Sequence, residues 1–245
     1  MQNLIHDTKR MKEIRENAWR SIKDRNFERR AYSYQKLYRK LMSDKTPVSV
    51  IMPVCGKPES YRQAINSVAE QSYPNIELIV INDCKKDNTL YELAKTINIP
   101  VRVIENDEGD YGLARARNKG IIEATGDILV FCDQRMVMDT NAVSEFVTHL
   151  TKRTWLYGDK DGKTNFVENF SAVFREDIVR SGMFNERINQ YGGMSQEIRS
   201  RIQYQGMTAK LLKTARANPK GSSKNVYTRK PEIVRMKNLL WKVGL

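Results

Sequence analysis

The sequence predicts an α/β fold built on a mostly parallel sheet that helices cover on both sides. Two near-continuous apolar runs of strand length, VSVIMPV (48–54) and IELIVIN (76–82), lack the regular polar alternation of a half-exposed strand. Segments with helical spacing separate these runs from two later ones. This alternation is typical of parallel sheets buried on both faces, in which ligands bind outside the carboxyl ends of the strands.

The remaining elements extend this pattern along the chain. We expect helices over 58–70, 88–97 and 111–124, and strands over 100–106 and 127–133. After residue 140 the regular alternation of strand and helix ends. We expect a helix over 141–151, a strand entering a helix over 169–176, a loop over 184–193 and a helix over 195–206. The carboxyl ends of the four clearest strands fall at 53–56, 82–85, 106–109 and 132–135, where a ligand would bind.

Both ends of the chain are basic. The formal charge of the 245 residues is +13, of which residues 1–46 carry about +7 and residues 207–245 about +9. We expect a basic helical extension over 1–46, the α/β domain over 47–215, and a basic tail over 216–245 with a linker at 217–230 and an amphipathic helix at 231–243. Such ends suit a polyanionic partner, but they could equally be solvated helices or an oligomer contact.

Several protein classes are disfavoured by composition. No apolar run approaches the length of a membrane span, and the N-terminus has no apolar signal core. The three cysteines are too few for a disulfide scaffold and suit small apolar packing. We therefore expect a cytoplasmic protein, with the inner membrane face as a peripheral location.

Three blocks together resemble family 2 glycosyltransferases with the GT-A fold, across about residues 47–212. VSVIMPVCGKPESYRQAINSVAEQSYPNIELIVINDCKKDNT resembles the opening of that family. GLARARNKGIIEATGDILVFCD resembles its A-R-N-x-G helix and G-D strand, and FREDIVRSGMFNERINQYGGMSQEIRSRIQYQG keeps the spacing of its acceptor-side block. The resemblance implies a mixed sheet flanked by helices, and transfer of a sugar from a nucleotide-sugar, usually a UDP-sugar, with inversion.

The resemblance also assigns the residues of the donor site. Asp83 stands where the family binds the uracil ring, and a carboxylate suits an imide N–H. The alternative for Asp83 is a helix N-cap. The other positions that match donor-binding residues are Pro53, Val54, Glu59, Arg117, Asn118, Asp133 and Gln134.

The metal-binding motif of the family is incomplete. Asp133–Gln134–Arg135 replaces the usual D-x-D, whose carboxylates hold Mg²⁺ or Mn²⁺ against the diphosphate. A guanidinium cannot bind a metal, but Arg135 could bind phosphate directly. Asp133 remains the one candidate metal ligand, so we expect a weakened requirement for Mg²⁺ or Mn²⁺.

The general base is also altered. Met194 and Ser195 stand where the family has Glu-Asp. Glu197 therefore becomes the best surviving base, ahead of Asp159, Asp161 and Glu186. A carboxylate near a helix N-terminus also has a purely structural explanation.

Three functions therefore remain open. The first is a glycosyltransferase using a nucleotide-sugar donor and an anionic acceptor, such as a membrane-linked glycan. The second is a catalytically inactive binding or scaffold protein, which the degenerate motifs would favour. The third is a nucleic-acid-associated protein that acts through its basic ends.

Overall fold

The computed structural model describes residues 34, 37, 44–83, 88–106, 112–163, 165–188 and 192–220. The chain divides into two compact units, Met1–Asp44 and Lys45–Leu245. The sheet and its flanking helices belong to the second unit. The expected helix at 231–243 lies outside the described residues, as does most of the expected N-terminal helix.

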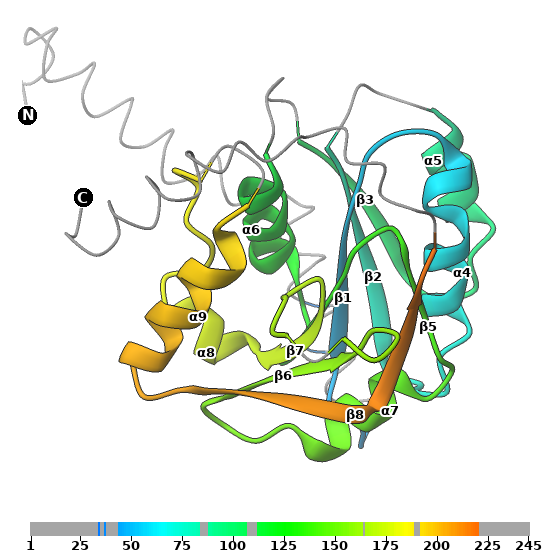
Figure 1. Cartoon of the computed structure of the whole chain (residues 1–245). Helices are drawn as coiled ribbons and strands as arrows, with labels where there is room; N and C mark the ends of the chain where they lie inside the picture. The colour runs from blue at the N-terminus through cyan, green and yellow to red at the C-terminus, as the bar shows by residue number, and fades with distance from the viewer. Residues whose placement is uncertain are drawn as a thin grey trace, which may run out of the picture. The chain divides into compact units, whose positions relative to one another are not determined.

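Eight strands form one mixed sheet in the order β3-β2-β1-β4-β7-β6-β8-β5 (Figure 1). Their bounds are Val48–Val54 (β1), Ile76–Asn82 (β2), Val101–Glu105 (β3), Ile128–Cys132 (β4), Met136–Met138 (β5), Thr154–Asp159 (β6), Phe170–Phe174 (β7) and Thr208–Pro219 (β8). The first four in the spatial order run parallel, β7 pairs antiparallel with β4 and β6, and β6 runs parallel to β8. The predicted mixed α/β sheet is therefore confirmed.

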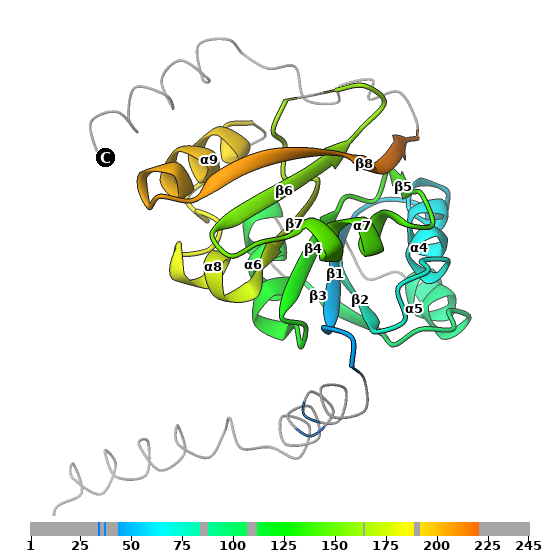
Figure 2. The same ribbon diagram turned by 90° about the horizontal axis from the view of Figure 1, so that it is seen from below.

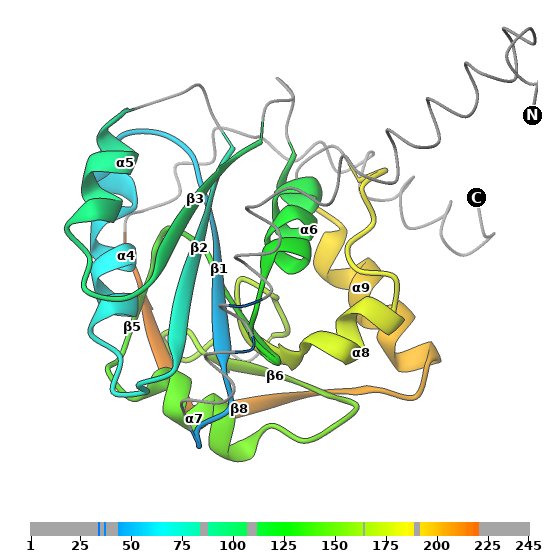
Figure 3. The ribbon, with the colours of Figure 1, turned by 180° about the vertical axis from the view of Figure 1, so that it is seen from behind.

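Helices cover both faces of this sheet, as Figures 1 and 3 show. They are η1 (Pro58–Ser60), α4 (Arg62–Ala69), α5 (Asn88–Lys95), α6 (Leu113–Glu123), α7 (Ala142–His149), α8 (Arg175–Arg180) and α9 (Met194–Tyr204). One apolar core joins alternate β1 residues to α4, α5 and α7, and a second joins the opposite face to α6, α8 and α9. Burial on both faces explains why β1 and β2 have no exposed residue.

The predicted bounds of β1 and β2 match the structure, whereas three strands were not predicted. β5 has only three residues, and β6 begins shortly after the end of α7. β8 runs along β6 and then pairs its last residues with β5 (Figure 2). Because β8 continues to Pro219, it crosses the predicted domain boundary at 215, and residues 217–219 are strand instead of the expected linker.

Helix α6 lies unusually close to the sheet because of one glycine. A Cβ added at Gly120 would lie 2.4 Å from Cγ2 of Ile51 and 3.2 Å from Cδ1 of Ile81, so a larger residue would force the helix outward. This close approach places the preceding turn of α6, with Arg117 and Asn118, against the carboxyl end of the sheet.

Candidate active site at the carboxyl edge of the sheet

Two aspartates follow neighbouring parallel strands at the same edge of the sheet. Asp83 follows β2 and donates its backbone N–H to the carbonyl oxygen of Val54, the last residue of β1, at 2.9 Å. Asp133 follows β4 and donates its backbone N–H to the oxygen of Asn169 at 2.9 Å. Since β1 lies between β2 and β4, both carboxylates flank one strand end. This is the edge at which α/β sheets bind ligands.

Asp83 is held by a residue that the sequence did not single out. Asn106, directly after β3, donates from Nδ2 to Oδ1 of Asp83 at 2.6 Å. Partial burial raises the pKa of Asp83, while the Asn106 bond and the charge of Arg115 act in the opposite direction. The buried Oδ1 of Asn106 has no hydrogen-bond partner among the described residues. Asp83 is thus an oriented carboxylate, and its predicted role with a nucleobase stays a prediction.

Asp133 belongs to a buried cluster of charged residues. Arg117 is 1% exposed, and its guanidinium donates to Oδ1 of Asp133 at 2.8 Å and to Oε1 of Glu168 at 2.5 Å. Burial raises the pKa of Asp133, which the charge of Arg117 opposes and that of Glu168 reinforces. Arg117 therefore does not lie on an exposed helix face, and both of its terminal nitrogens are paired with carboxylates. Its predicted contact with the donor stays a prediction.

Lys160 completes this cluster. It directly follows β6, is 3% exposed, and donates from Nζ to the oxygen of Val167 and to Oδ1 of Asn169, both at 3.2 Å. Burial lowers the pKa of Lys160, against the opposing negative charges of Glu168 and Asp133. We refer to Arg117, Asp133, Lys160 and Glu168 as the charge cluster. It contains two carboxylates and two cationic side chains.

Gln134 and Arg135 differ in their surroundings. Gln134 accepts the backbone N–H of Cys55 at 2.5 Å and donates to its oxygen at 2.9 Å, which ties the end of β4 to the end of β1. This pairing gives Gln134 a structural role beside its predicted contact with the donor. Arg135 is exposed, and its side chain has no hydrogen bond or ion pair among the described residues. It remains available to bind an anion.

The atoms around Asp133 that could coordinate a metal do not fit a resident divalent cation. Mg²⁺ and Mn²⁺ prefer several oxygen ligands, and the neighbouring carboxylate expected at position 135 is a guanidinium. The one remaining carboxylate already accepts a hydrogen bond from Arg117. An ion bound at Oδ1 would have to displace this guanidinium, and it would be repelled by Lys160.

Asn118 holds a loop on the far side of α6. Its amide donates from Nδ2 to the oxygen of Phe184 at 2.9 Å and to Oε1 of Glu186 at 2.7 Å, and its oxygen accepts the N–H of Phe184 at 2.9 Å. Asn118 is buried. Both ends of its amide are therefore bonded to the 184–186 loop, and its predicted contact with the nucleotide stays a prediction.

Replacing Asn118 with alanine is expected to lower the free energy of unfolding by about 1–3 kcal/mol, because buried backbone groups of Phe184 lose their partner. Urea unfolding measures this change. Asn185→Ala, in the same loop but only half-buried, serves as the matched control. Equal stability of Asn118→Ala and wild type would contradict the role of Asn118 in holding the 184–186 loop.

The remaining predicted donor residues form one wall of this edge. Pro53 and Val54 are buried at the end of β1, while Glu59 is exposed in η1. Gly56, between them, has φ 106°, a conformation that glycine adopts without strain. The loop therefore turns sharply out of β1 toward Glu59.

Ser195 and Glu197 lie in the first turn of α9, next to the charge cluster. Sδ of Met194 is 3.8 Å from a guanidinium nitrogen of Arg117, which fixes this proximity. The Glu197 carboxylate forms a two-point ion pair with Arg201 at 2.9 and 3.0 Å, and Arg201 also binds the backbone oxygens of Ser181 and Met183. Glu197 is thus a constrained carboxylate and would act as a base only after this pair opens.

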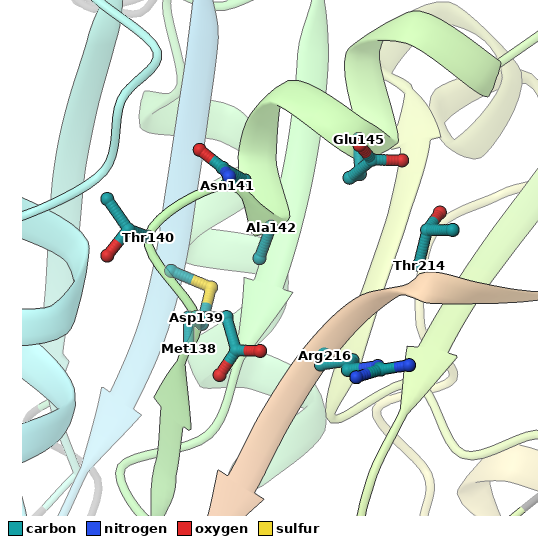
Figure 4. Close-up of a pocket in the computed structure, with 8 residues that line it drawn as sticks. All are labelled: Met138, Asp139, Thr140, Asn141, Ala142, Glu145, Thr214 and Arg216. Atoms are coloured by element: carbon teal, nitrogen blue, oxygen red, sulfur yellow. The ribbon is translucent and has the colours of Figure 1, made fainter.

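A pocket of about 610 Å³ lies elsewhere (Figure 4). Its lining comes from the end of β5, the start of α7 and β8, and includes Asp139, Glu145 and Arg216. Ser72, shortly before β2, donates its N–H to the oxygen of Thr140 in this wall. The pocket therefore lies toward the amino ends of the parallel strands, away from Asp83 and Asp133.

The cysteines differ from the expectation of small apolar packing in one case. Cys132 is buried and free, and burial raises the pKa of its thiol. Cys55 is disulfide-bonded.

Within the described ranges, no helix has the length and apolar character needed to cross a membrane.

Solved structures that resemble this fold include a mannosyltransferase. A mannosyltransferase from Pyrobaculum calidifontis, solved with GDP-Man and Mn²⁺, superposes with a TM-score of 0.63 at 19% identity, over 90% of this chain and 72% of that one. S. aureus TarS 1-349 with UDP-GlcNAc gives 0.62 at 17% identity, over 78% and 64%. The sheet and its helices are therefore those of the GT-A fold.

The chain belongs to glycosyl transferase family 2, whose family model matches residues 49–193. The Escherichia coli glucosyltransferase WfgD, named for the acceptor α-D-GlcNAc-diphosphoundecaprenol, is 28% identical over 59% of this chain and 56% of its own length. The E. coli protein WcaA, named as a putative colanic acid biosynthesis glycosyl transferase, is 28% identical over 48% and 44%. The chain thus spans about half the length of these curated relatives.

Proposed function

We propose that this protein is an inverting glycosyltransferase that uses a UDP-sugar. The single observation that carries the proposal is the placement of Asp83 and Asp133 at one carboxyl edge, with the end of β1 between them. Asp83 would accept the imide N–H of uracil. Asp133, through its charge cluster, and the exposed Arg135 would face the diphosphate.

The reaction is a single displacement at the anomeric carbon. The acceptor hydroxyl oxygen forms a bond to that carbon while the bond from the carbon to the diphosphate oxygen breaks. The electron pair leaves with the diphosphate, whose growing charge needs nearby cations. The hydroxyl proton passes to a carboxylate, for which Glu197 in the first turn of α9 is our candidate, with Ser195 beside it.

The acceptor we propose is a glycan linked to a lipid diphosphate at the inner membrane face. Support comes from the acceptor in the name of WfgD and from the basic ends of this chain. An anionic membrane surface would attract such ends. The alternatives, a catalytically inactive binding protein and a nucleic-acid-associated protein, gain no comparable support.

Calorimetric titration of the full chain with UDP and with GDP tests the donor. We expect UDP to bind at least about tenfold more tightly, because Asp83 stands at the position where the family binds the uracil ring. Release of UDP from UDP-glucose in the presence of a diphosphate-linked acceptor tests transfer. Tighter binding of GDP would refute the UDP assignment, and binding of a nucleotide without turnover would favour the inactive binding protein.

A further inference from the structure

The charge cluster is balanced without any metal ion. Asp133 and Glu168 supply two negative charges, and Arg117 and Lys160 supply two positive charges. All four lie together at the carboxyl edge, and three of them, Arg117, Lys160 and Glu168, are almost fully buried. A divalent cation between two carboxylates would give the same sum. Buried charges must be compensated in this way, since an unpaired one is strongly destabilising.

Lys160 acts on Asp133 by two routes. The first is electrostatic, since the negative charge of the Asp133 carboxylate raises the pKa of Lys160 against the effect of burial. The second runs through Asn169, whose side chain accepts from Lys160 while its backbone oxygen accepts the N–H of Asp133. Lys160 also fixes the oxygen of Val167, and so it fixes both neighbours of Glu168. One side chain thereby holds groups beside both carboxylates of the cluster.

We propose that Arg117 and Lys160 neutralise the two carboxylates that would otherwise require a divalent cation, so that this chain binds the diphosphate of its donor without metal, with Lys160 as the positioning residue. The proposal rests on the proposed function for the identity of the ligand. Its physical basis is that each carboxylate is already neutralised. A second source of positive charge would be repelled by two buried cations and by the nearby Arg135.

The test is calorimetric titration with UDP, in EDTA and in Mn²⁺, of wild type and three variants. Lys160→Met keeps the length of the side chain and removes its charge. Lys163→Met removes an equal charge from an exposed position in the same turn and is the matched control. Arg135→Met tests the other cation near Asp133.

For wild type, we expect UDP affinity in EDTA and in Mn²⁺ to agree within about twofold. Lys160→Met should lose about tenfold or more in EDTA, which corresponds to the loss of one favourable charge interaction. Mn²⁺ should then recover part of that loss, because two carboxylates are left with one cation. Lys163→Met should stay within about twofold of wild type. A merely structural role of Lys160 would not create a dependence on Mn²⁺.

Each other outcome has a distinct meaning. Wild-type binding that requires Mn²⁺ overturns the inference and leaves the proposed function intact. Unchanged affinity in Lys160→Met, or a full loss in Arg135→Met alone, also overturns it. No UDP binding in any condition overturns the proposed function and the inference together. If Lys160→Met does not fold, Lys160→Met/Glu168→Gln removes one charge of each sign and leaves Asp133 paired with Arg117, so UDP affinity should again agree within about twofold in EDTA and in Mn²⁺. A dependence on Mn²⁺ in this double variant would contradict the inference.

Discussion

Replacing Arg117 with methionine is expected to lower the free energy of unfolding by about 3 kcal/mol, toward the lower end of the range for breaking a buried ion pair. The guanidinium is 1% exposed and bridges Asp133 and Glu168, so its removal leaves two carboxylates facing one remaining cation. The side chain of Asp133 is 24% exposed, which lets water compensate part of the loss. Urea unfolding at neutral pH, with midpoint and slope both recorded, measures the effect.

Two further variants separate charge from packing. Arg180→Met breaks an ion pair with Glu176 of similar length on the exposed face of α8, where both side chains are more than half exposed, and should barely move the midpoint. Arg117→Met/Glu168→Gln removes one charge of each sign and should recover part of the stability lost by Arg117→Met. A similarly small shift of the urea midpoint in Arg117→Met and Arg180→Met would show that Arg117 does not stabilise the buried cluster.

The parallel half of the sheet could be predicted because its buried strands are continuous apolar runs in the sequence. β1 and β2 are buried along their full length, which only continuous apolar runs satisfy. The other half lacks this signal. β5 is too short to show a period, and β8 exposes Lys210, Lys213 and Arg216 along its length. In the sequence, such a strand resembles a charged connecting segment, and only its pairing with β6 identifies it as a strand.

The candidate site divides in the same way. Asp83 and Asp133 could be predicted because each directly follows an apolar parallel strand, and Asn106 stood at a predicted strand end. Lys160 and Glu168 follow β6 and precede β7, whose positions in the sheet depend on long-range antiparallel pairing. No local pattern marks that pairing. The partners of Arg117 and Asn118 likewise emerge only once α6 is packed on the sheet.

Replacing Asp83 with alanine is expected to weaken UDP binding by more than about tenfold, since the carboxylate that would accept the uracil imide is lost. The residue is oriented by Asn106 and lies away from the charge cluster, so the fold should persist. Glu70→Gln, at an exposed position that follows α4, removes one negative charge without touching this edge and should bind UDP like wild type. Calorimetry with UDP measures all three proteins.

The pH dependence gives a second, independent measure of the same residue. Burial raises the pKa of Asp83, so the folded protein protonates this carboxyl at a higher pH than an ordinary aspartate, whose pKa is about 3.9. Protonation removes the acceptor, and UDP affinity should therefore fall on acidification before that ordinary range is reached. Asp83→Ala should lose this contribution to the slope while Glu70→Gln keeps it. Unchanged UDP affinity in Asp83→Ala would remove Asp83 from the nucleobase site, and with it the main reason to favour UDP over another nucleotide.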